Sequence, residues 1–359
     1  MSVSNRSRRR VTVAAGVAVI ALLLTAAPAF AAGHIQSRFD VPVVDDPYDA
    51  QSDENIHVDG SIVYFLCTDS SFAGDTHDGY RWTIGDPSLT AFAPAADAED
   101  VDNGVAVYSS GGDGSPYEIR ATNGILDVVV RTQSPGHIPA NPRISGTRVV
   151  WEDWNATGTK CDIRGATIDP VTLAPTSTFA VCTAAGKQTR PSIDGDIVAW
   201  QDHRSGQWDI WARDLGSGTT KAICRVSGGQ AFPSVGGGWI AWVDFRSHAY
   251  GADIYARAWS GSTTRAVCHA AKAQKEVAVG DGFIVWTDWR NSGSGPDEPP
   301  NTSVRGYDIV SKQGFTIDGG PGMQFEPSID GATVAWLTSN DTHMGEPWWA
   351  GISGAVLRH

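Results

Sequence analysis

The residues best suited to chemistry stand at a fixed distance from a recurring tryptophan. An aspartate follows two positions after it, as Asp153, Asp202, Asp244 and Asp288, and in three places an arginine follows two further on, as Arg204, Arg246 and Arg290. Carboxylates and guanidinium groups could surround a ligand. Because the set recurs in unit after unit, we favour a structural role, in which the aspartate bonds loop amides and the arginine pairs across to the next unit.

Four histidines in polar segments are candidates for a transition-metal or general-base centre. They are His77, His203, His248 and His343. They follow no repeated ligand spacing, so ordinary loop histidines are the alternative. The chain also contains no Gly-x-Ser-x-Gly elbow, Walker loop or His-Glu-x-x-His motif, which leaves the histidines as the basis for any catalytic hypothesis.

Acidic residues gather in three long polar segments, at 68–78, 291–303 and 338–347. We predict binding residues here and beside them: Asp69, Asp75, Asp78, Asp297, Glu298, Asp341 and Glu346, with Trp289 and Trp348 as rings that could stack on a sugar. Oxygen-rich loops could hold Ca²⁺, although no EF-hand motif is present. Solvated acidic loops without an ion are the alternative.

The elements that must position these residues follow from the repeat. Seven aromatic anchors recur at intervals of 42 to 50 residues: Phe65, Tyr108, Trp151, Trp200, Trp242, Trp286 and Trp336. A period of about 40–50 residues with an aromatic signature is typical of four-stranded propeller blades. We therefore predict an all-β fold, a seven-bladed β-propeller of antiparallel blades, with six or eight blades as the alternatives.

Each unit has the same internal order. A short strand ends in a turn such as Asp194-Gly195, which favours a hairpin, and a nearly continuous apolar strand follows, as expected between two covering blades. The last unit lacks a fourth strand. We expect the apolar segment at about 35–44 to supply it, so that the N-terminal strand closes the ring and leaves no open sheet edge.

The repeat also resembles a known family. Pro191-x-Ile193-x-Gly195-x-x-Val198-x-Trp200-x-Asp202-x-Arg204, followed by Asp209-Ile210-Trp211, is similar to the TolB-like propeller repeats of secreted and cell-surface proteins. The resemblance is clearest from the third to the sixth unit. It implies a propeller that presents a binding face, and for many members it implies no catalysis.

Residues 1–31 predict a secretory signal peptide. They combine four arginines, an apolar run over 11–24 and the small-residue sequence Ala29-Phe30-Ala31, after which we expect cleavage. A membrane anchor is the alternative, and export by the general or the twin-arginine route stays open. Residues 32–359 then form one domain, secreted or associated with the cell wall, without a membrane span.

The net charge of −13 is carried by 40 acidic against 27 basic residues, and the leader contains only basic ones. An acidic surface argues against nucleic-acid partners, whose phosphates require Lys and Arg patches. Five cysteines remain in an oxidising compartment. We predict a disulfide between Cys161 and Cys182, near the two ends of one predicted hairpin.

Two functions from different classes fit these observations. We favour a non-enzymatic, monomeric module without a cofactor that binds an extracellular protein or glycan through one loop face. The alternative is a secreted polysaccharide-acting enzyme, a lyase or hydrolase with a metal held by loop histidines, a class that the TolB-like propellers of oligogalacturonate lyases make conceivable. Clustering of His203 and His248 with Gln230 around a central pocket would favour the enzyme, whereas their separation on the rim would favour binding.

Overall fold

The structure is a computed structural model of the whole chain. It describes residues 34–41, 56–69, 76–88, 90–92, 99–112, 114–247, 251–292, 301–339 and 350–359. The proposed signal peptide lies outside the described residues. No helix is assigned anywhere in these ranges, and so none that could cross a bilayer.

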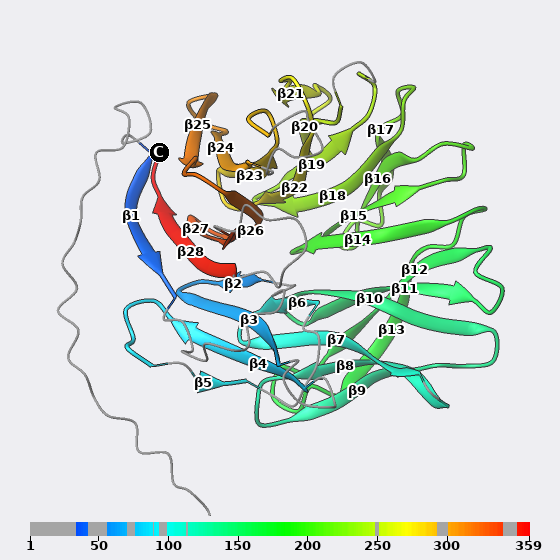
Figure 1. Cartoon of the computed structure of the whole chain (residues 1–359). Helices are drawn as coiled ribbons and strands as arrows, with labels where there is room; N and C mark the ends of the chain where they lie inside the picture. The colour runs from blue at the N-terminus through cyan, green and yellow to red at the C-terminus, as the bar shows by residue number, and fades with distance from the viewer. Residues whose placement is uncertain are drawn as a thin grey trace, which may run out of the picture.

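Seven sheets of four antiparallel strands stand around a central cavity, so the predicted seven-bladed β-propeller is confirmed (Figure 1). The innermost strands of blades 1 to 7 are β2 (His57–Asp59), β6 (Asp100–Asp102), β10 (His137–Ser145), β14 (Gln188–Asp194), β18 (Gln230–Gly236), β22 (Gln274–Val279) and β26 (Met323–Asp330). The second strands are β3 (Ile62–Asp69), β7 (Val105–Gly112), β11 (Arg148–Asn155), β15 (Ile197–Asp202), β19 (Trp239–Asp244), β23 (Phe283–Asp288) and β27 (Thr333–Ser339).

The outer half of each blade follows the same order. The third strands are β4 (Thr76–Thr83), β8 (Ser115–Thr122), β12 (Cys161–Ile168), β16 (Asp209–Asp214), β20 (Asp253–Ala258), β24 (Ser303–Asp308) and β28 (Ala350–Leu357). The outermost strands of blades 1 to 6 are β5 (Thr90–Ala91), β9 (Asp127–Thr132), β13 (Pro175–Cys182), β17 (Thr220–Cys224), β21 (Arg265–Cys268) and β25 (Gln313–Asp318).

The N-terminal strand completes the seventh blade, as predicted. Strand β1 (Ile35–Asp40) pairs antiparallel with β28, with Phe39 opposite Gly354. Outer strands place a phenylalanine opposite a glycine in two other blades, as Phe179 opposite Gly165 and Phe315 opposite Gly306. β1 therefore takes the place of an ordinary fourth strand and closes the ring.

The aromatic anchors fill the wedges between blades, which explains their period. Trp242 of β19 is fully buried and packs with Ile210 and Ile223 of the preceding blade. Trp200, Trp286 and Trp336 occupy equivalent clusters, each between two neighbouring blades. The second strands are buried on both faces, in agreement with the apolar runs in the sequence.

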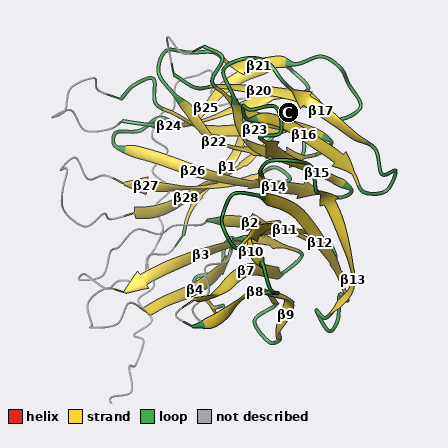
Figure 2. Ribbon diagram, turned by 90° about the vertical axis from the view of Figure 1, so that its right-hand side faces the viewer, coloured by secondary structure: helices red, strands yellow, loops and turns green. Residues whose placement is uncertain are grey.

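The strands run from one face of the ring to the other (Figure 2). We call the face on which second strands end and third strands begin the loop face, and the face of the Asp-Gly turns the turn face. The recurring Trp-x-Asp-x-Arg residues lie toward the loop face, because each aspartate ends a second strand.

The inner strands are sheet edges, and side chains of the preceding blade satisfy their amides. Hydroxyl groups of Ser192, Ser234 and Ser328 accept the amides of Val235, Val279 and Val58 at 3.0 to 3.1 Å. At the turn face, carboxylates of Asp330, Asp59 and Asp102 accept the amides of Gly60, Gly104 and Gly146. These recurring bonds link neighbouring blades around the axis and leave fewer edge amides unpaired.

Candidate functional site

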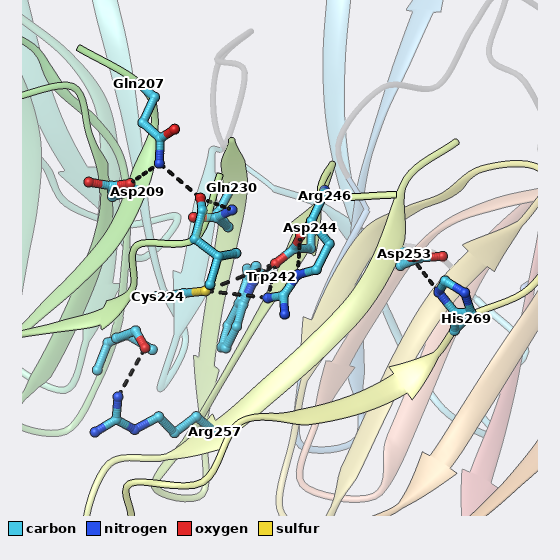
Figure 3. A network of polar contacts seen from close by, with 12 residues as sticks. Gln207, Asp209, Cys224, Gln230, Trp242, Asp244, Arg246, Asp253, Arg257 and His269 are labelled. Atoms are coloured by element: carbon cyan, nitrogen blue, oxygen red, sulfur yellow. Dashed lines mark hydrogen bonds and ion pairs between the residues drawn. The ribbon is translucent and has the colours of Figure 1, made fainter. Parts of the chain in front are cut away.

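The Trp-x-Asp-x-Arg residues form closed structural units. In blade 5, the Asp244 carboxylate accepts the indole N–H of Trp242 at 2.9 Å (Figure 3). The same carboxylate accepts three hydrogen bonds from Arg246, which donates its backbone N–H, Nε and Nη2. The same guanidinium donates to the Cys224 sulfur of the preceding blade at 3.4 Å and lies over the Tyr255 ring at 3.9 Å. The indole, the carboxylate, the guanidinium and the thiol of the unit are thus engaged with one another, which supports the scaffold interpretation.

Blades 4 and 6 repeat this arrangement. Asp202 pairs with Trp200 and Arg204, and Asp288 with Trp286 and Arg290. Burial alone would raise the pKa of Asp288, but hydrogen bonds from Arg290 hold that pKa below its ordinary range. The arginine therefore pairs with its own aspartate and reaches back to a cysteine, which differs from the predicted pairing with the next blade.

Blade 3 lacks the arginine and replaces it from another strand. Arg164 of β12 donates to Asp153 at 2.6 Å, and His137 contacts the same carboxylate at 2.9 Å. Asn155, at the arginine position, instead binds loop amides of Thr159 and Lys160. The buried carboxylate therefore keeps a cationic partner although the motif has changed.

The predicted disulfide is not present in the structure, in which Cys161 and Cys182 are both free thiols. Cys161 lies opposite Trp154, whereas Cys182 lies opposite Ile163. The Cys182 sulfur is directed to Arg204 of the next blade, whose guanidinium donates to it at 3.2 Å. The Cys182 thiol, which was predicted to form a disulfide, therefore serves as an acceptor for the arginine of the neighbouring blade.

Most predicted binding and metal residues lie outside the described side chains. Asp75, Asp297, Glu298, Asp341, Glu346, Trp348, His248 and His343 fall in undescribed ranges. The backbone of Asp69, His77 and Asp78 is described, and it continues β3 and β4 as a paired hairpin up to Asp69 opposite Thr76. The predicted loop at 68–78 is therefore shorter than expected, because the strand ladder continues into it.

Three residues of the predicted binding surface and enzyme cluster have described side chains, and none of them lines the central cavity. His203 lies beside the Trp208 ring at 4.9 Å on the loop face, and Gln230 is fully buried at the start of β18. The Lys275 ammonium lies 5.3 Å from the centre of the Trp289 ring and covers one face of that ring. His203 and Gln230 therefore do not meet at the central cavity, and His248, the other histidine of the expected cluster, lies outside the described residues. Among the described residues no group of three ligating side chains could hold a metal ion, and the histidine metal centre and the calcium site stay predictions.

The central cavity has a volume of about 440 Å³ and is lined by the inner strands of all seven blades. Toward the turn face its wall carries the carboxylates that bridge blades. Burial raises the pKa of Asp102 and of Asp194, although each accepts a glycine amide. This end of the cavity is therefore acidic and largely occupied by structural bonds.

One arc of the wall departs from the repeat. Where blades 4, 5 and 7 carry a serine, blades 1 to 3 carry His57, Asp100 and Arg143. Asp100 still accepts the amide of Ile144 at 2.9 Å, as the serines do in their blades. Burial raises the pKa of Asp100 to about 6, despite the charge of Arg143 and its amide bonds. His57 lies 3.8 Å from this carboxylate, so three ionisable groups meet here.

A second set of wall residues has one backbone conformation and different side chains. A bulge in the inner strand of blades 4 to 7 holds Arg190, Phe232, Glu276 and Glu326 at φ values of 50° to 53°, and all four line the cavity. The preceding blade fixes these amides: Glu152 accepts that of Arg190 at 2.7 Å, and Gln201 that of Phe232 at 3.2 Å. Left-handed backbone is costly for such residues and persists where the surroundings impose it.

We call these four residues the bulge ring; the sequence analysis did not identify them. Their signal was a variable residue before a repeated proline, as in Arg190-Pro191, Phe232-Pro233 and Glu326-Pro327. The equivalent residue of blade 3 is Asn141, which has the same φ of 51° but does not line the cavity.

The comparisons with known proteins show likeness in structure only. No protein family model matches the chain, and no curated protein is similar to it in sequence. The β-propeller domain of the trilobed protease from Pyrococcus furiosus is similar over 85% of this chain and 93% of that one, at 9% identity and a TM-score of 0.62. A puromycin-hydrolysing peptidase of Mycobacterium tuberculosis matches over 85% of this chain and 52% of its own, at 14% identity and a TM-score of 0.59.

An oligogalacturonate lyase in complex with manganese is similar over 83% of this chain and 86% of its own, at 11% identity and a TM-score of 0.56. The chain spans about half the length of the acylaminoacyl and puromycin-hydrolysing peptidases that it matches. At these identities the likeness concerns the fold, which hosts many unrelated functions. Together with the seven blades, it identifies the fold as a seven-bladed β-propeller, with which the resemblance of the repeat to TolB-like propellers is consistent.

Proposed function

We propose that this propeller is a secreted, non-enzymatic module that binds an extracellular protein or glycan, and that the bulge ring and the wall around it are its binding surface. The supporting observation is a constant backbone that carries variable side chains. Arg190, Phe232, Glu276 and Glu326 share one conformation and one wall, yet they differ in charge and shape. Variable groups held on a rigid scaffold are typical of binding surfaces.

The constant polar residues support the same proposal, because their hydrogen-bonding groups are engaged within the scaffold. Asp202, Asp244 and Asp288 each bind an indole and a guanidinium, and the inner-strand serines bind amides. Selection of a ligand therefore falls to the side chains that change from blade to blade.

An Asn-ring variant tests the proposal. It carries Arg190→Asn, Phe232→Asn, Glu276→Asn and Glu326→Asn, because Asn141 occupies the same left-handed position in blade 3. Wild type and variant are screened against an array of extracellular glycans and proteins, after circular dichroism has verified that both fold. We expect at least one ligand that the wild type retains and the variant loses at least tenfold in affinity.

Equal binding by both proteins, or no binding by the wild type, would refute this role for the wall. Conversion of a bound glycan during the assay would instead support the polysaccharide-acting enzyme. Export is tested separately by N-terminal sequencing of protein recovered from the medium, where a start at Ala32 is expected and an intact leader would contradict it.

A further inference from the structure

Along blades 3 to 7, the inner strands place side chains of different charge in different sectors of the cavity wall. Blades 3 and 4 contribute the guanidinium groups of Arg143 and Arg190, blade 5 contributes the Phe232 ring, and blades 6 and 7 contribute the carboxylates of Glu276 and Glu326. A cationic sector, an aromatic sector and an anionic sector thus follow one another over these five blades, and Glu99 and Asp100 of blade 2 adjoin Arg143.

The cationic sector has donors that the scaffold does not use. The Arg190 guanidinium lies 4.5 Å from the centre of the Phe232 ring, and among the described residues no carboxylate pairs with it. Arg143 donates to the carbonyl of Pro142 at 2.7 Å and lies 3.9 Å from Glu99, a separation too long for a hydrogen bond. Guanidinium groups from two neighbouring blades that line one cavity and keep unused donors favour a carboxylate, which guanidinium binds in a planar fork.

In the anionic sector, the carboxylate of Glu276 is engaged through one of its two oxygens. One oxygen of Glu276 accepts the Thr287 hydroxyl at 2.6 Å and the amide of Glu326 at 2.9 Å, which fixes the carboxylate at the wall. Its second oxygen has no described hydrogen bond, so the charge faces the cavity with capacity to accept a further donor. Glu326 follows in the next blade and adds a second carboxylate.

The aromatic sector separates the two charged ones. Phe232 keeps 43% of its surface exposed, which is unusual for a phenylalanine and leaves part of the ring open to the cavity. An apolar group placed against this ring would remove both surfaces from water.

We infer that the cavity binds a small zwitterion of the α-amino-acid type with an apolar side chain. Its carboxylate faces Arg143 and Arg190, its side chain lies against Phe232, and its ammonium group faces Glu276 and Glu326. The three substituents of one tetrahedral carbon thus meet the three sectors in their order around the wall. A volume of about 440 Å³ is within the range of small-ligand sites.

The net charge of the surroundings favours a zwitterion over a simple anion. Besides the two glutamates of the anionic sector, the wall carries Glu99, Asp100, Asp102, Asp194, Asp281 and Asp330, and the whole chain has a charge of −13. A dianion such as phosphate would meet this field unfavourably, whereas a zwitterion carries no net charge and aligns with the two opposite sectors.

Calorimetric titration with three related probes tests the inference on the full chain. L-phenylalanine has both charges, L-phenylalaninamide lacks the carboxylate, and N-acetyl-L-phenylalanine lacks the ammonium group. We expect L-phenylalanine to bind and each of the other two to bind at least tenfold more weakly. No binding of L-phenylalanine at about 10 mM, or equal affinity for all three probes, would overturn the inference without any variant.

Variants then assign the sectors. Arg190→Asn, which reproduces the residue type that blade 3 carries as Asn141, should weaken L-phenylalanine at least tenfold and leave the affinity for the amide unchanged. Lys312→Asn is the matched control, because Lys312 is exposed, also has a positive φ of 60° and lies in the outer turn of blade 6. Equal effects of both variants would contradict the assignment.

This inference rests on the proposed role of the bulge ring, but the two experiments can refute one of them without refuting the other. If the Asn-ring variant loses a macromolecular ligand while L-phenylalanine does not bind the wild type, the zwitterion site is refuted and the proposed function stands. If L-phenylalanine binds while the macromolecular screen finds nothing, the site stands and the proposed function is refuted.

Discussion

The role of a single residue in this protein depends on whether the same residue type recurs at its position in other blades or differs from blade to blade. Asp244 belongs to the retained set and is fully buried among Trp242, Arg246 and Cys224. Asp100 belongs to the changed set, since it replaces a serine that links blades elsewhere. The two aspartates should therefore respond in opposite ways to removal of their charge.

Asp244→Ala should lower the free energy of unfolding by about 3–5 kcal/mol, because it leaves a partly buried guanidinium and an indole N–H without their acceptor. Urea unfolding followed by tryptophan fluorescence measures the loss. Asp244→Leu combined with Arg246→Leu removes both charges and should recover part of it. A loss below about 1 kcal/mol in the single variant would contradict the engaged unit.

Asp100→Ser should stabilise the protein increasingly as the pH rises. An ordinary aspartate has a pKa near 3.9, and burial raises the pKa of Asp100 to about 6, so the folded chain holds this proton more tightly than the unfolded chain. Stability is therefore lost between pH 4 and pH 6, by at most about 3 kcal/mol. The serine has no such titration and still accepts the Ile144 amide, as Ser192, Ser234 and Ser328 do for their neighbours.

Urea unfolding of wild type and Asp100→Ser at pH 4 and pH 7 checks this. The difference in unfolding free energy between variant and wild type should grow toward pH 7. A pH-independent difference would mean that the Asp100 carboxylate is not desolvated in the folded chain.

At the scale of elements, glycines opposite phenylalanines hold the outer strands close to their neighbours. A Cβ built on Gly354 would lie 2.1 Å from the Phe39 ring of the closing strand, and one on Gly306 would lie 2.5 Å from Phe315. Both pairs are directly opposite in their ladders. The closing strand therefore docks by the same contact that an ordinary outer strand uses.

Gly354→Ala should destabilise the protein by about 1–3 kcal/mol, because the phenylalanine must move away and the closing strand loosens. Gly314→Ala is a suitable control, since its Cβ would meet nothing closer than 3.9 Å. Thermal unfolding by circular dichroism compares the two. Equal melting temperatures for both variants would contradict the docking contact.

The sequence predicted the elements well because the same local physics recurs in each unit. Asp-Gly turns and apolar second strands follow from local chemistry, and the seven anchors mark wedges that any propeller must fill. The hairpin of β3 and β4 extended further than predicted, since ladder length depends on pairing rather than on composition. Cys182 paired with Arg204 instead of Cys161, because inter-blade contacts cannot be read along one chain segment.

The site was less predictable than the fold for a similar reason. The bulge ring depends on a left-handed conformation that neighbouring blades impose through Glu152 and Gln201. Residues such as Glu276 and Phe232 do not by themselves indicate positive φ. Their convergence on one wall became visible only once seven inner strands surrounded one axis.

At the scale of the whole molecule, the ring should tolerate a change in where it is cut. The carbonyl of His34 accepts the amide of Arg358 at 2.8 Å, so the two ends of the described propeller are adjacent. A circular permutant that joins residue 359 to residue 34 through a short Gly-Ser linker, with new ends between Ser217 and Gly218, should fold with a melting temperature within about 5 °C of the wild type.

In the wild type, blade 7 is the blade that combines strands from both ends of the chain. In the permutant this role passes to blade 4, where the new ends fall in an exposed turn. Removal of residues 1–41 should be far more damaging, because it exposes the edge of β28. Circular dichroism melts of the three proteins make the comparison. A truncated chain as stable as the permutant would show that closure contributes little.

Closure by the N-terminal strand also determines how the ring yields to mechanical tension. Ile35 at the start of β1 lies opposite Leu357 at the end of β28, so a pull between the two ends acts across the ladder rather than along it. Under that load the hydrogen bonds carry the force one pair at a time and unzip in sequence. Because blades 1 to 6 are each built from one continuous stretch of chain, the seam in blade 7 is where a pulled propeller first opens.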